Sequence, residues 1–324
     1  MHTIRSMLMC GVASSVLAGC AIHPVPEDVT RKNTYKIVQA IRCEARDAVT
    51  DELAEELSRH PASEPLAQRL QSRDLKVQEF VHLYNLNAPE IVSVIHPKSE
   101  RRIAAYRAAS IGLDFQFDIT EINDKTFVAN LADPFTRGLF GLQLTSGDKR
   151  VRQNVRMFQV VDLFDKLLTD DALIEYCSNE TESFSGNWIY PITGNIGIKE
   201  VLGTFLDLAE YVGYREKTDF SDKLVFTTNY YGTADPKITI TAMNSSFHLD
   251  DVAGTGKADR RDIHQVTIAF ALPVTTEGAP TAAGRPRGVD TEAEVLRILK
   301  ERETEEFFED QRAISDAFRD FLNQ

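Results

Sequence analysis

The chain has 324 residues, 43% of them hydrophobic, which is enough apolar material for the core of one large domain or two. Its formal net charge of −13, from 36 Lys and Arg against 49 Asp and Glu, excludes the basic footprint of a general nucleic-acid-binding protein. After residue 20 no stretch reaches about 18 uncharged apolar residues, so we expect no second membrane segment and no nucleic-acid partner.

Residues 1–19 have the pattern of a secretory signal peptide. Arg5 is the only charged side chain before an apolar run from Met7 to Ala18, in which the thiol of Cys10 is the one ionisable group. The run is too short for a transmembrane helix, which needs about 20 apolar residues. A positive start, an apolar middle and a small-residue end are typical of a signal peptide.

The signal ends in Leu17-Ala18-Gly19-Cys20, which resembles the lipobox of bacterial lipoproteins. The resemblance implies cleavage between Gly19 and Cys20, a diacylglycerol on the Cys20 thiol and an acyl group on its freed amine. Several acyl chains anchor a protein stably, whereas one chain holds it only marginally. Ala21 replaces the Asp that retains enterobacterial lipoproteins in the inner membrane, so the resemblance implies an outer-membrane anchor and a periplasmic body. An ordinary signal peptide with a chance cysteine is the alternative.

Two cysteines, Cys43 and Cys177, remain if Cys10 leaves with the signal and Cys20 carries lipid. An oxidising periplasm favours a disulfide between them, and two buried free thiols are the alternative. Cys43 also lies nearly opposite the apolar side of its predicted helix, where a bond to another element explains it better than packing. The residues of that apolar side recur at three and four positions: Val38, Ile41, Ala45, Val49 and Leu53.

The N-terminal part of the body reads as a tether followed by helices. Residues 20–33 contain two prolines and no periodicity, which predicts an extended tether of some 40 Å at roughly 3.1 Å per residue. In the helical segment 34–97, one helix begins at Thr34 and a second runs from Ser63 to about Asn85. Between Arg101 and Ser110 the pattern does not separate a short helix from a strand.

Residues 98–273 predict a β-rich body with inserted helices. Leu113, Phe115, Phe117 and Ile119 alternate with polar residues, as in a strand with one buried face. We expect a turn at 146–148, helical insertions at 163–176 and 196–212, and a loop at 254–256. Short turns favour antiparallel pairing, so the predicted fold is α+β: an antiparallel sheet of about seven amphipathic strands, N-terminal helices and a long C-terminal helix.

The C-terminal part consists of a predicted linker, residues 274–288, and a helical segment, residues 289–324. Thr291-Glu292-Ala293-Glu294 has the form of a capping box, so Thr291 is the expected N-cap of a helix that ends near Leu322. The helix has an apolar stripe, which we expect to pack on the chain's own body; packing on a partner chain is the alternative. The stripe consists of Leu296, Leu299, Phe307, Ile314, Phe318 and Phe321.

Three segments of the mature chain resemble a group of proteobacterial envelope lipoproteins that have no assigned activity. They are residues 34–46, shortly after the lipobox, and residues 112–121 and 152–158. The resemblance implies an envelope location and transfers no catalytic residue.

No local motif nominates a catalytic, metal or cofactor site. The histidines show no His-Glu-x-x-His spacing, and no Gly-x-Ser-x-Gly occurs. Arg150, Arg152 and Arg156 share one strand face and could bind carboxylates or phosphates; a solvated face balanced by acids is the alternative.

Two functions therefore stay open. The first is a non-enzymatic accessory or scaffold, attached to the membrane by its lipid anchor, with an envelope protein as partner. The second is an envelope hydrolase whose site is assembled from separated carboxylate or histidine residues.

Overall fold

The computed structural model describes residues 24–30, 32–135, 138–179, 191–212, 219–239, 248–273 and 290–322. These residues belong to two compact units. Unit 1 takes its residues from the ranges 24–29, 117–155 and 227–263, and unit 2 takes the others. The predicted signal peptide, Cys20 and the predicted linker at 274–288 lie outside the described residues.

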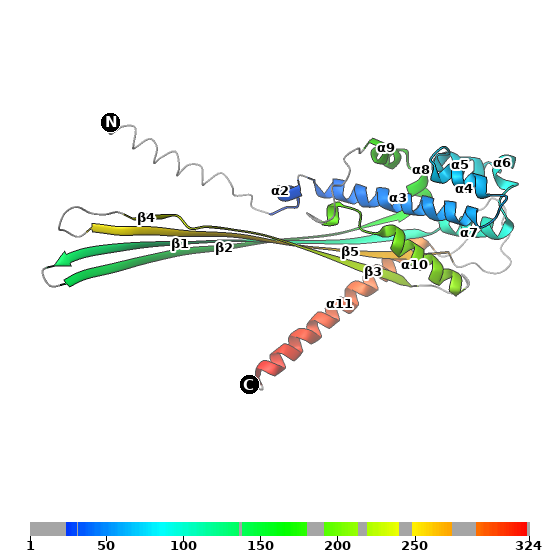
Figure 1. Cartoon of the computed structure of the whole chain (residues 1–324). Coiled ribbons are helices and arrows are strands. Elements are labelled where there is room, and N and C mark those ends of the chain that lie inside the picture. The colour runs from blue at the N-terminus through cyan, green and yellow to red at the C-terminus, as the bar shows by residue number, and fades with distance from the viewer. Residues whose placement is uncertain are drawn as a thin grey trace, which may run out of the picture. The chain divides into compact units, whose positions relative to one another are not determined.

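Most helices belong to unit 2 (Figure 1). They are α3 (Thr34–Ser58), α4 (Glu64–Gln71), α5 (Val77–Asn85), α6 (Pro89–Val92), α7 (Pro97–Arg107), α8 (Phe164–Thr169), α9 (Asp171–Asn179), the 3-10 helix η1 (Pro191–Thr193), α10 (Ile198–Tyr211) and α11 (Thr291–Leu322). The short α2 (Glu27–Thr30) precedes them. No helix of the described residues is long and apolar enough to span a membrane.

Helix α3 is the element on which several other helices of unit 2 pack. It begins where predicted, and the Asn33 side chain accepts a hydrogen bond from the Lys36 backbone N–H at 2.9 Å, which caps its N-terminus. Its predicted apolar side is buried from Val38 to Leu53. Helices α4, α7, α8, α9 and α10 all contact it, so one amphipathic helix organises the helical layer.

The single helix predicted from Ser63 to Asn85 is wrong, because the structure has α4 and α5 there. Arg73, between them, has a left-handed backbone with φ 61°, and the Leu75 N–H bonds to the Arg69 carbonyl at 2.9 Å. Leu75 and Val77, which follow this turn, are both buried. The ambiguous stretch from Arg101 to Ser110 is helical as far as Arg107, where α7 ends, and Ser110 begins β1. Pro97 lies in the first turn of α7, where its missing N–H has no cost.

The sheet consists of few, very long strands. They are β1 (Ser110–Phe135), β2 (Gly138–Leu163), β3 (Phe220–Ala234), β4 (Lys237–Thr239) and β5 (His248–Ala271). The order is β2-β1-β5-β3, and β4 pairs antiparallel with β5, placing Ile238 opposite Val252. The α+β class agrees with this mixture of helices and antiparallel strands, but the predicted sheet of about seven strands is wrong.

The predicted strand count is wrong because polar and glycine residues that are typical of turns lie inside continuous strands. Residues 146–148 lie inside β2, and residues 254–256 lie inside β5. A Cβ on Gly147 would lie 3.8 Å from the carbonyl oxygen of Lys125 on β1, so the two strands stay adjacent there. A glycine within a strand costs only about 0.5–1 kcal/mol, and continued pairing of the backbone outweighs it. Since residues 142–151 are all exposed, no alternation of burial distinguishes this part of β2 from a turn.

The core of unit 2 lies between its helices and the sheet. Phe270 of β5 stacks on Phe205 of α10, with ring centroids 5.1 Å apart, and meets Phe164 of α8 edge-on at 6.1 Å. All three side chains are almost fully buried. Alternation along β5 places Ala269 and Ala271 on the opposite face from Phe270.

That opposite face is covered by the first turns of α11. Val295, Ile298 and Leu299 are buried against Ala269 and Ala271. Packing of this part of the helix on the chain's own sheet is therefore observed, although Leu296, predicted as part of the stripe, is 43% exposed. The predicted stripe residues Phe307, Ile314, Phe318 and Phe321 have side chains outside the described part of the structure.

Thr291 does not cap α11 as the capping-box pattern predicts. Asp290 does so instead, because its Oδ1 accepts from the backbone N–H of Glu292 at 3.2 Å and of Ala293 at 3.4 Å. The Thr291 hydroxyl lies 2.8 Å from the Ser110 hydroxyl and donates to the Ala108 carbonyl at 3.0 Å. It therefore ties the start of α11 to the start of β1.

Candidate functional site

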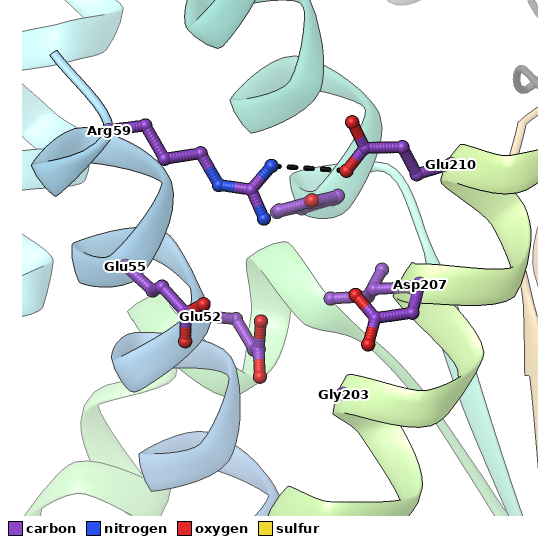
Figure 2. Close-up of a pocket in the computed structure, with 8 residues that line it drawn as sticks. Glu52, Glu55, Arg59, Gly203, Asp207 and Glu210 are labelled. Atoms are coloured by element: carbon purple, nitrogen blue, oxygen red, sulfur yellow. Dashed lines mark hydrogen bonds and ion pairs between the residues drawn. The ribbon is translucent and has the colours of Figure 1, made fainter.

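A small polar pocket lies in unit 2, with its walls formed mainly by α3 and α10 (Figure 2). Its volume is about 130 Å³. Residues three and four apart on a helix share one face, so each helix presents a short row of side chains to the pocket. The lining residues are Glu52, Glu55 and Arg59 of α3, Tyr106 of α7, and Gly203, Leu206, Asp207 and Glu210 of α10.

Gly203 allows α10 to approach α3 at this level. A Cβ there would lie 3.4 Å from Oε1 of Glu52, at the short end of ordinary van der Waals contact. The absence of a side chain at 203 thus leaves room for a carboxylate from the facing helix.

One end of the pocket is held by paired charges. Nη1 of Arg59 donates to Oε2 of Glu210 at 3.0 Å (Figure 2). Arg102 of α7 donates to Glu56 at 3.0 Å and also to Glu210. Glu56 is almost fully buried, so loss of Arg102 would leave a buried carboxylate with one remaining cation, Arg59. These two arginines and two glutamates form an ion-pair network that joins α3, α7 and α10.

The other end is acidic. Burial, followed by the nearby negative charge of Glu55, raises the pKa of Glu52 to about 7. Lys199 opposes this rise but is itself paired with Asp51 at 2.7 Å. A carboxyl group with a pKa near neutrality can give or take a proton at pH 7, which is the property of a general acid or base.

The size of the pocket limits what it can hold. Pockets that enclose organic ligands usually measure about 300–1,000 Å³, and this one is smaller, at about 130 Å³. Among the described residues, no group of three or more His, Cys, Asp or Glu side chains is arranged to hold a metal ion. The pocket has room for water, and the sequence did not reveal it because its carboxylates come from two helices that are about 150 residues apart in the chain.

Cys43 and Cys177 form the predicted disulfide. It joins α3 to α9, with a Cα–Cα distance of 5.6 Å across a sequence separation of 134. Both cysteines lie in unit 2.

The three arginines of the predicted anion-binding face each have an acidic or hydroxyl partner. Arg150 pairs with Asp148 at 2.9 Å, Arg152 pairs with Glu121 at 2.9 Å, and Arg156 donates to the Thr34 hydroxyl. Arg150 and Arg152 belong to unit 1, and Arg156 belongs to unit 2.

Unit 1 contains a buried charge cluster that the sequence analysis missed. Arg260 and Asp262 of β5 are 8% and 0% exposed, and Nε of Arg260 donates to Oδ1 of Asp262 at 2.9 Å. Nη1 of Arg260 lies 3.2 Å from Glu121 of β1, which also pairs with Arg152 of β2. The cluster thus joins three strands; its only signal in the sequence was a pair of charged residues at alternate strand positions.

Residues 24–29, expected as part of an extended tether, are folded onto this cluster. Nη2 of Arg260 donates to the Val25 carbonyl at 2.8 Å, and Nη1 lies 3.4 Å from Asp28. Asn154 of β2 donates to the Pro24 carbonyl at 2.8 Å. The tether prediction is wrong for this segment. Pro24 and Pro26 have no N–H for regular hydrogen bonding, but both are buried. The carbonyls of Pro24 and Val25 accept hydrogen bonds from side chains, so the segment is held against the strands.

The comparisons with known proteins identify relatives over most of the chain. The family model described as "Uncharacterised protein y4kA" matches residues 23–302. The protein of that description from Sinorhizobium fredii (strain NBRC 101917 / NGR234) is 35% identical over 296 residues, which cover 88% of each chain.

Similarity to solved structures is weak. The Salmonella SPI-1 type III secretion injectisome secretin InvG in its open gate state has a TM-score of 0.21 and 5% identity, over 53% of this chain and 63% of the secretin chain. The InvG secretin domain has a TM-score of 0.23 and 8% identity, over 66% of this chain and 74% of that chain. At such TM-scores the similarity establishes no common fold.

Proposed function

We propose that this chain, which belongs to the y4kA family, is a lipid-anchored envelope protein whose folded body is a non-enzymatic accessory or scaffold for another envelope component. The anchor would be on Cys20, with the body in the periplasm and the anchor in the outer membrane. The family description assigns no activity, so the proposal rests on the residues of the chain itself.

The Cys43–Cys177 disulfide is the observation that supports it best. Disulfides persist in oxidising compartments such as the bacterial periplasm and are rare in the cytosol. A leader that ends in Leu17-Ala18-Gly19-Cys20 would deliver the chain there and supply the anchor. The leader and the bond are independent features of the chain, and both agree with export.

Lipidation is tested by growing cells with a labelled fatty acid and measuring its incorporation into the protein. We expect label in the wild type and in Cys10→Ala, whose cysteine leaves with the leader, and none in Cys20→Ala. Mass spectrometry should find Cys20 as the acylated N-terminus. Equal labelling of the wild type and Cys20→Ala would contradict the proposal.

The acidic pocket favours one alternative, an envelope hydrolase. It brings separated carboxylates together and contains a glutamate with a pKa of about 7. Its small volume argues against the enclosure of a polymeric substrate. Complementation of a deletion strain by the Glu52→Gln variant decides between the two. If the protein is a hydrolase, the variant should fold but fail to complement the strain. If it is a scaffold, the variant should complement the strain as well as the wild type does.

A further inference from the structure

The described residues of unit 1 form a sheet of one layer. They belong to the strands, to the segment 24–29 and to the turn at residues 235–236, so the unit supplies no second layer from the part of the chain that the structure describes. A sheet is normally stabilised by burial against another element. Here large apolar side chains stay exposed on both faces, so neither face alone indicates a docking surface. They are Phe127, Leu142, Leu144, Val151, Val155 and Tyr231.

The two edges of this sheet are open to pairing. β2 is the outer strand on one side and β3 is the outer strand on the other, and no further described strand lies beyond either. Natural edge strands usually avoid pairing with other chains by being short or by carrying proline and lysine. β2 has 26 residues and β3 has 15, and each contains one lysine and no proline. Their outward N–H and C=O groups can therefore bind another strand.

A row of side chains crosses all four strands of unit 1 and fixes which positions lie at the same level. Arg152 of β2 pairs with Glu121 of β1 at 2.9 Å, and Glu121 lies 3.2 Å from Arg260 of β5. The register of β4 on β5, continued along β3, places Tyr230 beside Arg260. Burial and then the charge of Asp262 raise the pKa of Tyr230, and the charge of Arg260 opposes the rise, as expected for neighbours.

Adjacent strands of this sheet are antiparallel. On β1 and β5, for example, Glu121 lies beside Arg260, whereas a Cβ on Gly254 would lie 3.9 Å from the carbonyl oxygen of Thr126. Because four strands alternate in direction, the outer strands β2 and β3 run in opposite directions. A second copy in the same orientation therefore offers its β3 to β2 as an antiparallel partner, and the alternation continues across the contact.

Val151 and Tyr231 are the exposed ends of the next row. They follow Arg152 and Tyr230 by one position toward the same end of the sheet, so alternation places both on the opposite face from that row. Val151 is 57% exposed and Tyr231 is 88% exposed. When two copies lie side by side in the same orientation, the tyrosine of one meets the valine of the other. An aromatic residue beside a β-branched one is a favourable cross-strand pair.

We infer that a second copy of this chain is the partner of these edges, and that β2 of one copy pairs with β3 of the next, with Val151 beside Tyr231. The opposite strand directions and the common level of the two residues select this partner, because an unrelated strand need not match either. Each pair of copies keeps two open edges, so the contact repeats and gives assemblies larger than a dimer. The contact needs only the folded body, with or without a lipid on Cys20.

Cysteine crosslinking of the full-length chain tests the pairing. Val151→Cys and Tyr231→Cys carry different tags and are expressed together, and a thiol reagent with a spacer of about 10 Å also reaches diagonal neighbours at about 7–8 Å. We expect dimers that contain both tags at about tenfold the level given by the chain without an introduced cysteine, because pairing holds the thiols at a high effective concentration. Leu86→Cys, 64% exposed on α5, is the matched control for Tyr231→Cys and should give the background level.

A shift in register is covered by Lys149→Cys and Gln153→Cys, which lie on the same face of β2 as Val151 and are also exposed. Absence of mixed-tag dimers for all three β2 positions with Tyr231→Cys would overturn the inference. Dimers of Val151→Cys with itself at the same yield would assign the edge to a two-fold β2–β2 contact instead. Crosslinks from Val151→Cys to a different protein alone would assign it to another partner.

Charge substitutions test the same contact without a crosslinker. The double variant Val151→Lys with Tyr231→Lys places two cations side by side at every contact, and we expect it to be monomeric. Val151→Glu with Tyr231→Lys places opposite charges there and should assemble as the wild type does. Sedimentation in detergent measures the assembly, and equal melting temperatures show that both variants fold. A monomeric wild type, or equal assembly of the two double variants, would contradict the pairing.

Discussion

Oε1 of Glu44, on α3, accepts a hydrogen bond from the backbone N–H of Gly197 at 2.8 Å. The N–H of Ile198 also donates to Oε1 at 2.8 Å, and that of Ile196 donates to Oε2 at 2.9 Å. Gly197 is the N-cap residue of α10 and has no side chain to satisfy these donors. A carboxylate from a neighbouring helix therefore caps α10, which couples the formation of α10 to its packing on α3.

Removal of this cap should destabilise unit 2. We expect Glu44→Ala to lower the free energy of unfolding by about 1–2 kcal/mol, the upper part of the range for lost caps. The N–H groups of Ile196 and Ile198 lose their acceptor, whereas that of Gly197 keeps the Asn195 side chain at 2.8 Å. Urea denaturation followed by circular dichroism measures the change. Glu79→Ala, an exposed glutamate on α5, is the control and should change stability little. Equal midpoints for the two variants would show that water replaces Glu44 without loss.

Cys43, the residue before Glu44, forms the disulfide with Cys177. Removal of this disulfide should lower the free energy of unfolding more than removal of the Glu44 cap does. Cys177→Ser opens a loop with a sequence separation of 134, for which the chain-entropy model gives up to about 5 kcal/mol. The paired variant Cys43→Ser should lose the same amount, and the double variant should lose no more than either one. Alkylation of unfolded, unreduced wild-type protein should label neither cysteine; full labelling of both would contradict the bond.

Gly112 on β1 should tolerate no side chain. A Cβ at this position would lie 2.0 Å from Cγ1 of Val295 on α11, so Gly112→Ala must displace the helix or the strand. Overpacking of this kind costs typically about 1–3 kcal/mol. Thermal unfolding measures it, and Gly232→Ala is the control because nothing lies within 4 Å of a Cβ there. Restoration of stability by the second change Val295→Ala would identify the clash as the cause.

The buried apolar face of α3 could be predicted because it has a single helical period, and all of its predicted residues from Val38 to Leu53 are buried. Cys43 lay opposite this face, and that position correctly indicated a bond to another element. Both inferences depend on local geometry, which a helical wheel reproduces from sequence alone.

The long strands could not be predicted in the same way. Residues 142–151 of β2 are all exposed, so the period-two signal that burial imposes on a sequence is missing there. The acidic pocket and the Arg260 cluster could not be predicted from the sequence either. Their residues come from segments far apart in the chain, and no sequence spacing relates them. Arg260 and Glu121, for example, are 139 residues apart.

Glu52 should make stability depend on pH. Burial and the charge of Glu55 raise its pKa to about 7 in the folded state, whereas the unfolded value is near 4.3. The folded protein therefore binds more protons than the unfolded protein between these values, so stability falls as pH rises from about 4.5 to 7 and stays lower above that range. Glu52 is only partly buried, so solvent screens its charge and the loss is smaller than the full shift in pKa would give. We expect the free energy of unfolding to fall by about 1 kcal/mol over this pH range.

Glu52→Gln removes this titration and is the direct test. The variant should match the wild type near pH 5 and exceed its free energy of unfolding by about 1 kcal/mol at pH 8, because a neutral amide has no buried charge to develop. Glu55→Gln should act in the same direction but less strongly, since it removes one cause of the raised pKa and leaves the burial of Glu52 unchanged. Glu79→Gln should leave the pH profile as it is in the wild type. A constant stability difference between the wild type and Glu52→Gln from pH 5 to pH 8 would show that Glu52 titrates at its ordinary pKa, and the pocket would then lose its one candidate acid or base.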